Sequence, residues 1–212
     1  MSAASTLIVI AKAPRPGHSK TRLCPPCTPR QAADLALAAL RDTLTAVLRT
    51  PGVDRRVLVL DGTPGAWVPA SFEVLPQRGD GLDERLAAAF DDVGDPALLV
   101  GMDTPQISPS LLRAGLDALD ADPAALGPAP DGGYWAIGLR EPDAEVFRGV
   151  PMSTAHTCAA QRARLDERGL SWAELPLLRD VDRIEDAHAV AALAPEGRFA
   201  RTLDALGEAL VP

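Results

Sequence analysis

A basic loop between Lys12 and Arg22 holds the residues of this sequence that are best suited to chemistry. It reads Lys12-Ala-Pro-Arg-Pro-Gly-His-Ser-Lys-Thr-Arg22 and follows an apolar run that ends at Ala11. Ligands of open α/β sheets bind where strands end, and Lys, Arg and backbone N–H groups bind phosphate. The cations Lys12, Lys20 and Arg22, with Gly17 among them, therefore predict a site for a nucleotide's phosphate chain. The pattern excludes a Rossmann fingerprint and a Walker A loop at this position.

Two acidic segments offer candidate ligands for Mg²⁺ or Mn²⁺. Asp103 lies in Gly101-Met-Asp103-Thr-Pro105, directly after the most hydrophobic predicted strand, where a carboxylate can hold a divalent cation beside a phosphate. The alternative is an Asx-turn in which Asp103 bonds only its own backbone. Asp182 lies in Asp180-Val-Asp182-Arg-Ile-Glu185, and we expect it to reach the same metal while Asp180 caps or orients. The alternative here is a capping box, with Asp182 as N-cap and Glu185 at N3.

A glycine pair offers one part of an acceptor pocket. In Asp131-Gly-Gly-Tyr134, Gly132 and Gly133 permit positive φ or a close approach of the backbone to a ligand, and Tyr134 with Trp135 can wall a pocket. The alternative is an ordinary hairpin turn, since Asp-Gly is also a strong hairpin signal.

A second segment, Ser153-Thr154, precedes a predicted helix. Its hydroxyls and N–H groups could bind the phosphate or carboxylate of an acceptor, or could serve only as a helix cap. His156 falls in the first predicted turn, as an acceptor ligand or as a plain exposed histidine. Gln77, which follows another predicted strand, offers the paired donor and acceptor needed to read a base edge, or belongs to a surface loop.

The elements that must position these side chains alternate along the chain, which predicts an α/β fold: a three-layer α/β/α sandwich with a mostly parallel central sheet. Apolar runs predict strands over 6–11, 56–60, 72–75, 97–102, 124–126 and 134–139, with a possible short strand over 174–177. Helical periodicity predicts helices over 36–47, 82–93, 109–119, 154–168 and 184–193, with an amphipathic tail over 196–210 that covers a sheet edge.

Composition limits the partners. The chain has 212 residues and a net charge of −8, so a basic loop on an acidic body indicates a small anionic ligand and excludes nucleic acid. No apolar run is long enough to span a membrane, and there is no secretion signal, so we expect one cytoplasmic domain over 1–212. Cys24-Pro-Pro-Cys27 has the spacing of a redox pair or half a zinc site, but only Cys158 remains as a further thiol, which favours a structural role.

The ordered motifs resemble the radical-SAM/selenodomain-associated transferase 1 family, within the GT-A-like nucleotide-diphospho-sugar transferase superfamily. They are also similar to the guanylyltransferases of deazaflavin cofactor synthesis, which act on phosphoenolpyruvate or lactyl phosphate. The resemblance covers nearly the whole chain and rests on the following motifs: Lys12-Ala-Pro-x-Pro-Gly-x-x-Lys20-Thr-Arg-Leu23, Gln77-x-Gly79, Leu82-x-x-Arg85, Gly101-x-Asp103-x-Pro105, Gly127-Pro-Ala-x-Asp131-Gly-Gly-Tyr134, Ser153-Thr154 and Asp180-Val-Asp182.

The resemblance implies roles for individual residues. Lys20 and Arg22 would contact a triphosphate, Asp103 and Asp182 the metals, Ser153 the acceptor, and Gln77 and Arg85 the nucleotide. The sequence departs from the family pattern at three positions. Asp83 stands where glycine is usual, Met152 where tryptophan is frequent, and Arg183 where threonine usually follows the last aspartate.

These observations predict a metal-dependent, nucleotide-using transferase that acts as a monomer or homodimer. The leading hypothesis is nucleotidyl transfer from a nucleoside triphosphate to a small phosphorylated or hydroxylated acceptor, with Lys20, Arg22 and Asp103 as the catalytic residues. The first alternative is glycosyl transfer from a nucleotide-sugar. The second is a nucleotide-binding module without turnover, in which Asp103 is only a turn residue and Asp182 only a cap.

Overall fold

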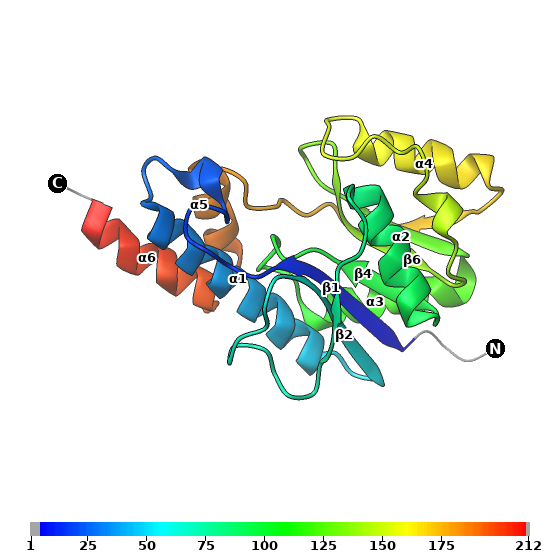
Figure 1. Cartoon of the computed structure of the whole chain (residues 1–212), viewed down its shortest axis with the longest axis horizontal. Helices are drawn as coiled ribbons and strands as arrows, with labels where there is room; N and C mark the ends of the chain where they lie inside the picture. The colour runs from blue at the N-terminus through cyan, green and yellow to red at the C-terminus, as the bar shows by residue number, and fades with distance from the viewer. Residues whose placement is uncertain (1–4, 211–212) are drawn as a thin grey trace.

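The computed structural model describes residues 5–210 and contains a seven-stranded sheet with helices on both faces (Figure 1). The strand order is β3-β2-β1-β4-β6-β5-β7, and all neighbours are parallel except β6, which is antiparallel to β4 and β5. The strands are β1 (Thr6–Lys12), β2 (Arg55–Asp61), β3 (Glu73–Pro76), β4 (Ala97–Val100), β5 (Ala124–Pro128), β6 (Tyr134–Leu139) and β7 (Trp172–Glu174). The predicted mostly parallel α/β sheet is confirmed.

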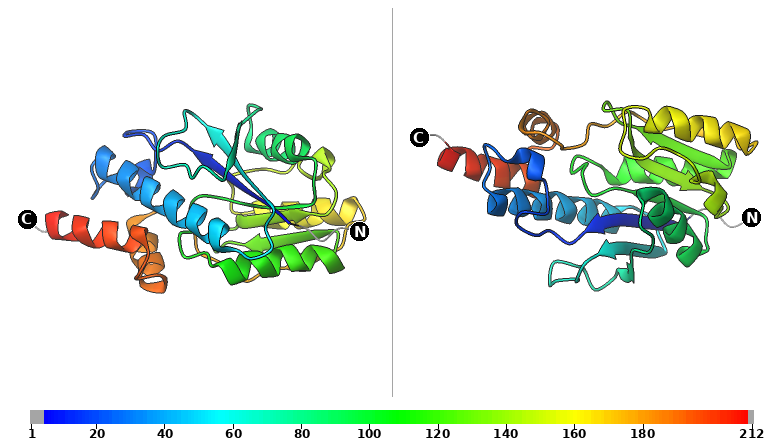
Figure 2. Two further views of the ribbon diagram at one scale, coloured as in Figure 1. Left: turned by 90° about the horizontal axis from the view of Figure 1, so that it is seen from below. Right: turned by 45° about the horizontal axis from the view of Figure 1, so that its top comes forward.

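Two hydrophobic cores fill the layers on either side of the sheet. One packs α1 (Pro29–Arg49) and α3 (Pro109–Ala121) on one face, through residues such as Leu44 and Leu116. The other packs α2 (Leu82–Val93), the 3-10 helix η2 (Ala144–Val146) and α4 (Thr157–Glu167) on the opposite face, with Phe90 stacked on Phe147. Both views in Figure 2 show the sheet between these two layers.

A third core lies beyond the end of the sheet. It joins η1 (Thr21–Leu23), the start of α1, α5 (Ile184–Leu193) and α6 (Arg198–Leu210), with Leu23, Leu35, Val181 and Phe199 buried in it. Figure 1 shows these helices together at the end of the molecule away from the N-terminus. The prediction that the tail covers a sheet edge is wrong, because α6 buries its apolar face against α1 and α5.

Helix starts follow local hydrogen-bond chemistry. Thr28 and Gln31 form a capping box ahead of Pro29, so α1 begins earlier than its apolar periodicity predicts. Ser108 caps α3 as predicted, by accepting from the N–H of Leu111. The predicted box of Asp182 with Glu185 is wrong by one residue, because Arg183 is the N-cap of α5 and its N–H is held by Asp186.

Two further boundaries differ from the prediction. The helix expected from residue 154 begins at Thr157, because the side chains of Thr154 and Thr157 bond the backbone in a turn before it. The last strand lies at Trp172–Glu174, earlier than the expected 174–177, where it pairs in parallel with β5. Over residues 5–210 no helix is both long and apolar enough to cross a membrane.

Candidate functional site

The basic loop leaves the carboxyl end of β1 and turns back over the sheet edge toward α1. Lys20 is held at φ 50°, a left-handed conformation that is uncommon for a residue with a side chain, and Ser153, across the site, has φ 59°. Within the described part of the chain these are the only non-glycine residues with positive φ. Because such conformations persist only where the surroundings impose them, the backbone at both positions is held by its surroundings.

Lys20 joins the loop to two distant segments. Its Nζ lies 2.8 Å from Asp103 Oδ1 and also donates a hydrogen bond to the carbonyl of Val181. The Lys20 side chain is only 11% exposed, so this ammonium group is held in one place. Asp103 Oδ1 is itself buried, and the lysine is not aligned to give it a hydrogen bond, nor does any other residue of the described chain.

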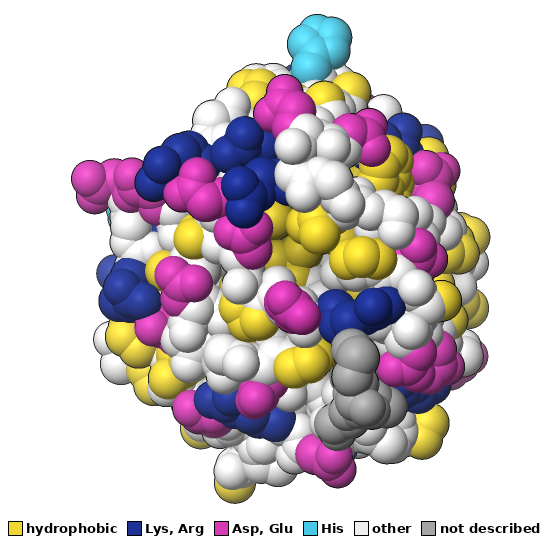
Figure 3. All heavy atoms as spheres, turned by 90° about the vertical axis from the view of Figure 1, so that its right-hand side faces the viewer, with side chains coloured by type: hydrophobic (Ala, Val, Ile, Leu, Met, Phe, Trp, Pro, Cys, Tyr) yellow, Lys and Arg dark blue, Asp and Glu magenta, His cyan; other side chains and the backbone are white. Residues whose placement is uncertain are grey.

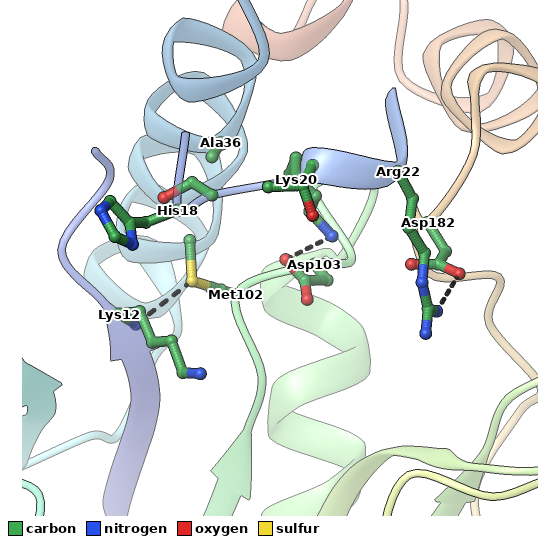
Figure 4. A pocket seen from close by; sticks show the side chains of 10 residues that line it. Lys12, His18, Lys20, Arg22, Ala36, Met102, Asp103 and Asp182 are labelled. Carbon is green, nitrogen blue, oxygen red and sulfur yellow. Dashed lines mark hydrogen bonds and ion pairs between the residues drawn. The ribbon is translucent and has the colours of Figure 1, made fainter. Parts of the chain in front are cut away.

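Arg22 forms a second ion pair beside the first. Its Nη1 donates to Asp182 Oδ2 at 2.6 Å, and the arginine side chain is 69% exposed. An ion pair this exposed adds little to stability, so the pair is easily exchanged for another partner. Figure 4 shows the two ion pairs next to each other, and Met102 lies between Asp103 and Lys12. The fold therefore brings two residues predicted to bind phosphate, Lys20 and Arg22, against the two predicted metal ligands. Each basic side chain pairs with one carboxylate.

Two cavities meet at Asp103, Met102 and Lys12. The smaller, about 230 Å³, is lined by the basic loop, with His18, Lys20 and Arg22, and by Asp182. The larger, about 600 Å³, crosses the edge of the sheet from the β3 side to the β5–β6 side. Its lining includes Gln77 and Arg85 at one end and Asp131, Gly133, Tyr134, Ser153 and Thr154 at the other. Most of the predicted nucleotide and acceptor residues thus share one continuous space.

The Gln77 side chain is bonded within the protein. Its Nε2 donates to the carbonyls of Ala11 and Val59, and its Oε1 accepts from Arg85 Nη1 at 3.3 Å. Arg85 also bonds the carbonyl of Gly79 and lies 3.4 Å from Asp61. Gln77 therefore ties the ends of β1 and β2 together, and reading a base edge would require it to give up one of these bonds.

The Asp131-Gly-Gly segment is the turn of the β5–β6 hairpin, and its Asp131 and Gly133, but not Gly132, line the larger cavity. Gly132 has φ 90°, and a Cβ there would lie 2.0 Å from the carbonyl oxygen of Ala155. The carbonyl of Gly132 accepts from the N–H of Cys158 at 2.7 Å. The close approach expected of this glycine is therefore made to the start of α4, which fixes the loop that carries Ser153.

Threonine hydroxyls at the start of α4 bond the backbone N–H groups of the same segment. Thr157 Oγ1 accepts from the N–H of Thr154, and Thr154 Oγ1 accepts from the N–H of His156. His156 is the exposed N-cap residue and lies outside the lining of both cavities, as does Gly17. Ser153 lines the larger cavity, and its hydroxyl forms no hydrogen bond with the chain over 5–210.

Tyr134 contributes its ring to the cavity wall, whereas its hydroxyl is buried. The hydroxyl donates to Gln161 Oε1 at 3.3 Å and lies near the sulfur of Met152. Burial raises the pKa of Tyr134 far above its usual value, with smaller contributions from Cys158 and Asp83. The side chain therefore stays neutral and shapes the pocket.

Asp180 brings a further carboxylate to the same space, next to Asp131 and Asp103. Burial raises its pKa above the usual range, and the negative charges of Asp131 and Asp103 add to the increase, while Lys20 opposes it. Asp180 lines the larger cavity, whereas Asp182 faces the smaller one. The sequence predicts only a supporting role for Asp180, because two aspartates two positions apart cannot be assigned to different cavities without knowledge of the backbone.

The carboxylates suit a cation that a nucleotide helps to hold. Over residues 5–210 no three His, Cys, Asp or Glu side chains lie close enough to form a metal site by themselves. Mg²⁺ usually takes one or two carboxylates and completes its shell with water and substrate phosphates. Asp103, with a buried oxygen that accepts no hydrogen bond, and Asp182 fit that donor set.

Some residues line the larger cavity although the sequence predicted no role for them there. Leu82 is 41% exposed at the nucleotide end, and Met152 lies against Tyr134 at the other. Thr104 is 2% exposed, and its buried hydroxyl finds no partner in the described chain. Apolar side chains look like core residues in a sequence, and a single threonine between Asp103 and Pro105 carries no signal of its own.

The sheet topology and the site at its carboxyl edge define a GT-A-like nucleotide-diphospho-sugar transferase fold. A provisionally assigned nucleotide-diphospho-sugar transferase from Desulfovibrio desulfuricans G20 is similar to this chain with a TM-score of 0.86 and 26% identity, over 98% of this chain and 96% of that one. Residues 35–154 match the family described as "Uncharacterized protein conserved in bacteria (DUF2064)". The chain belongs to this family.

More distant structures share the fold alone. CMP:2-keto-3-deoxy-manno-octonic acid synthetase, solved with CTP, has a TM-score of 0.58 at 15% identity, over 91% of this chain and 99% of that one. Rv0371c of Mycobacterium tuberculosis H37Rv, solved with manganese, has a TM-score of 0.50 at 20% identity, over 89% and 98% of the two chains. No curated protein matches the sequence significantly.

Proposed function

We propose that residues 1–212 form a metal-dependent nucleotidyltransferase domain that transfers a nucleotidyl group from a nucleoside triphosphate to a small acceptor. The observation that carries the proposal is the double pairing of Lys20 with Asp103 and of Arg22 with Asp182. A nucleotide that binds together with a metal ion offers its negative phosphates to Lys20 and Arg22. The metal ion offers positive charge to the two carboxylates. Binding would therefore exchange both ion pairs without leaving any of the four charges unpaired.

In this proposal the chain positions the reactants and balances their charge. The acceptor hydroxyl attacks the α-phosphorus from the Ser153 side of the cavity and gives its proton to a carboxylate at that end, Asp131 or Asp180. The bond between the phosphorus and the bridging oxygen breaks, and pyrophosphate leaves beside Lys20 and Arg22. Mg²⁺ or Mn²⁺ held by Asp103 and Asp182 would supply Lewis-acid stabilisation of the phosphates. Rv0371c, the more distant structure solved with manganese, is compatible with this choice of cation.

Glycosyl transfer from a nucleotide-sugar is the second candidate, and the name given to the Desulfovibrio protein favours it. We also propose that the chain falls in the radical-SAM-associated group that its motifs resemble. Two cations at the end of the phosphate chain suit a triphosphate better than a diphosphate, which is why nucleotidyl transfer is the leading proposal.

Thermal unfolding with nucleoside triphosphates, nucleotide-sugars and nucleosides, each with and without Mg²⁺, tests the proposal, since a ligand of the folded state raises Tm. We expect the largest shift for a triphosphate with Mg²⁺. Asp103→Asn keeps the size of the side chain but not its charge, and should remove the part of the shift that depends on Mg²⁺. Asp117→Asn, on the outer side of α3, is the matched control. Shifts that are equal for nucleoside and triphosphate would contradict the proposal.

A further inference from the structure

The acceptor end of the larger cavity carries negative charge only. Its charged lining residues are Asp131, from the β5–β6 turn, and Asp180, which follows β7. The cations that line the same cavity are Lys12 and Arg85, from β1 and α2 at the nucleotide end. No Lys, Arg or His of the described chain lines the end formed by the β5–β6 turn and the loop before α4. Like charges in a partly enclosed site repel, so this end disfavours an anion.

The backbone at the start of α4 does not compensate for the missing cations. Exposed N–H groups at a helix start are the usual alternative for binding a phosphate or carboxylate. Here the N–H groups of Thr154, His156, Thr157 and Cys158 are bonded to Thr157 Oγ1, Thr154 Oγ1, the Thr154 carbonyl and the Gly132 carbonyl. The N–H group of Thr154, which sequence analysis assigned to an anionic acceptor, and those of the following residues are therefore already used within the protein, whereas the Ser153 hydroxyl stays open.

The groups that remain open at this end are mainly hydrogen-bond acceptors. One carboxylate oxygen of Asp131 accepts from the N–H of Gly133 at 2.8 Å, which leaves its second oxygen available. Asp180 adds another carboxylate, Ser153 an unbonded hydroxyl at the surface of the cavity, and Thr104 a buried hydroxyl without a partner in the described chain. Carboxylates accept hydrogen bonds from hydroxyl groups, and such charge-assisted bonds are short and strong.

From this arrangement we infer that the acceptor is a neutral polyhydroxylated compound, a sugar or cyclitol without phosphate or carboxylate, whose hydroxyl groups donate to Asp131 and Asp180. The inference rests on the proposed function and selects the hydroxylated acceptor over the phosphorylated one. It also separates the two ends of the cavity by charge: the nucleotide phosphates lie toward the cations, and the neutral acceptor lies against the carboxylates.

The test compares neutral polyols with their charged counterparts. Binding of D-glucose, D-mannose, myo-inositol and glycerol is measured by calorimetry against D-glucose 6-phosphate, D-mannose 6-phosphate, inositol 1-phosphate, glycerol 3-phosphate and D-gluconate. Each is measured with and without the triphosphate that gives the largest thermal shift. We expect at least one neutral polyol to bind at least tenfold more tightly than its charged counterpart.

Two variants of Asp131 sharpen the comparison. Asp131→Asn keeps an oxygen for the N–H of Gly133 but loses the charge, so it should preserve Tm and weaken binding of the neutral polyol about tenfold, as expected for a lost charge-assisted bond. Asp131→Lys should shift the preference toward the phosphorylated counterpart. Asp166→Asn removes an exposed carboxylate from the last turn of α4 and is the matched control. It should change neither the affinity for the neutral polyol nor the preference over its phosphorylated counterpart.

Tighter binding of the charged compounds by the unchanged protein would overturn the inference, and so would triphosphate binding without binding of any neutral polyol. Polyol binding that is insensitive to Asp131→Asn would overturn the assignment of this carboxylate. Failure of every nucleotide to bind, with polyol binding as expected, would instead overturn the proposed function and leave the acceptor assignment supported.

Discussion

At the scale of single residues, the ion pairs that Lys20 and Arg22 form with two aspartates lead to the first prediction. Lys20→Ala and Arg22→Ala should each weaken triphosphate binding by about 1.5–3 kcal/mol and leave nucleoside binding nearly unchanged, because each removes a charge-assisted bond to phosphate. The effect of Lys20→Ala should be the larger, since the Lys20 side chain is nearly buried and the Arg22 side chain is exposed.

Arg49→Ala is the matched control for this comparison. It removes one exposed positive charge from the last turn of α1, away from the loop, and should leave triphosphate binding unchanged. Calorimetry with the nucleoside and the triphosphate measures all three variants. Equal weakening of both ligands in Lys20→Ala would indicate that the loop acts through its shape and not its charge.

Asp186 leads to a prediction about pH. Burial alone would raise its pKa, but hydrogen bonds from Arg179 and from the N–H groups of Arg183 and Asp182 lower it below the usual 3.8. A carboxyl whose pKa is lower in the folded state stabilises the protein above the unfolded-state pKa, and this stability is lost as pH falls through the folded-state pKa. Asp186→Asn should therefore reduce the free energy of unfolding by about 1 kcal/mol at neutral pH, and by less as pH falls through the lowered pKa of Asp186.

Urea unfolding at several pH values checks this prediction. Glu185→Gln, the neighbouring carboxyl in the same first turn, is the control and should change stability by only a few tenths of a kcal/mol. If the loss in free energy of unfolding caused by Asp186→Asn stayed the same in strong acid, the charge of the carboxylate would contribute nothing to stability.

At the scale of elements, the contact between the β5–β6 turn and α4 predicts a strict requirement at Gly132. Gly132→Ala would place a Cβ 2.0 Å from the Ala155 carbonyl, and neither backbone segment can move without breaking the Cys158–Gly132 hydrogen bond. We expect a loss of more than about 2 kcal/mol in the free energy of unfolding, or a displaced α4 start.

Gly149 supplies the control for Gly132. It also has positive φ, 75°, but a Cβ there meets nothing within 4 Å. Gly149→Ala should therefore cost only about 1 kcal/mol, the strain of the backbone conformation alone. Urea unfolding measures both variants, and equal losses would mean that the contact with Ala155 relaxes at no cost.

Much of the element pattern could be predicted from local chemistry. The apolar run before Ala11 and the helix over 82–93 follow from periodicity, and Ser108 with Pro109 marks a helix start in the sequence. The cap of α5 could not be chosen in this way, because Asp182 and Asp186 both suit a helix start. In the structure Asp182 pairs with Arg22, which lies 160 positions away in the chain, and Asp186 bonds the N–H group at the start of α5.

The candidate site was predictable as a set of residues but not as a set of contacts. The sequence grouped Lys20 with Arg22 and Asp103 with Asp182, by charge and by presumed role. The fold pairs them across these groups. Such partners depend on which segments the third core brings together, and no local pattern encodes that.

At the scale of the whole molecule, the third core predicts a link between the C-terminal helices and ligand binding. Leu203→Ala in α6 should lower the free energy of unfolding by about 2–5 kcal/mol and also weaken triphosphate binding, because α6 supports η1 and the segment at Val181. Leu116→Ala in α3 should cost as much stability but spare binding, because it lies in the core against the sheet. Unfolding and calorimetry at a temperature where both variants are folded make the comparison.

The face of the molecule near the N-terminus carries positive and negative side chains intermixed, without a broad field of one sign (Figure 3). In the basic loop, Lys20 and Arg22 are likewise each paired with a carboxylate. This face therefore offers no broad positive surface to a long polyanion, which agrees with the small anionic ligand that we propose.

The third core also has a consequence for the order of events during synthesis. When β7 has left the ribosome, every strand of the sheet has its neighbours, but Leu23 still lacks the partners that α5 and α6 will supply. The bond from Lys20 to Val181 spans 161 positions and forms only when the last sixth of the chain arrives. A nascent chain can thus complete its set of strands before it can form the contact between Lys20 and Val181 at the basic loop.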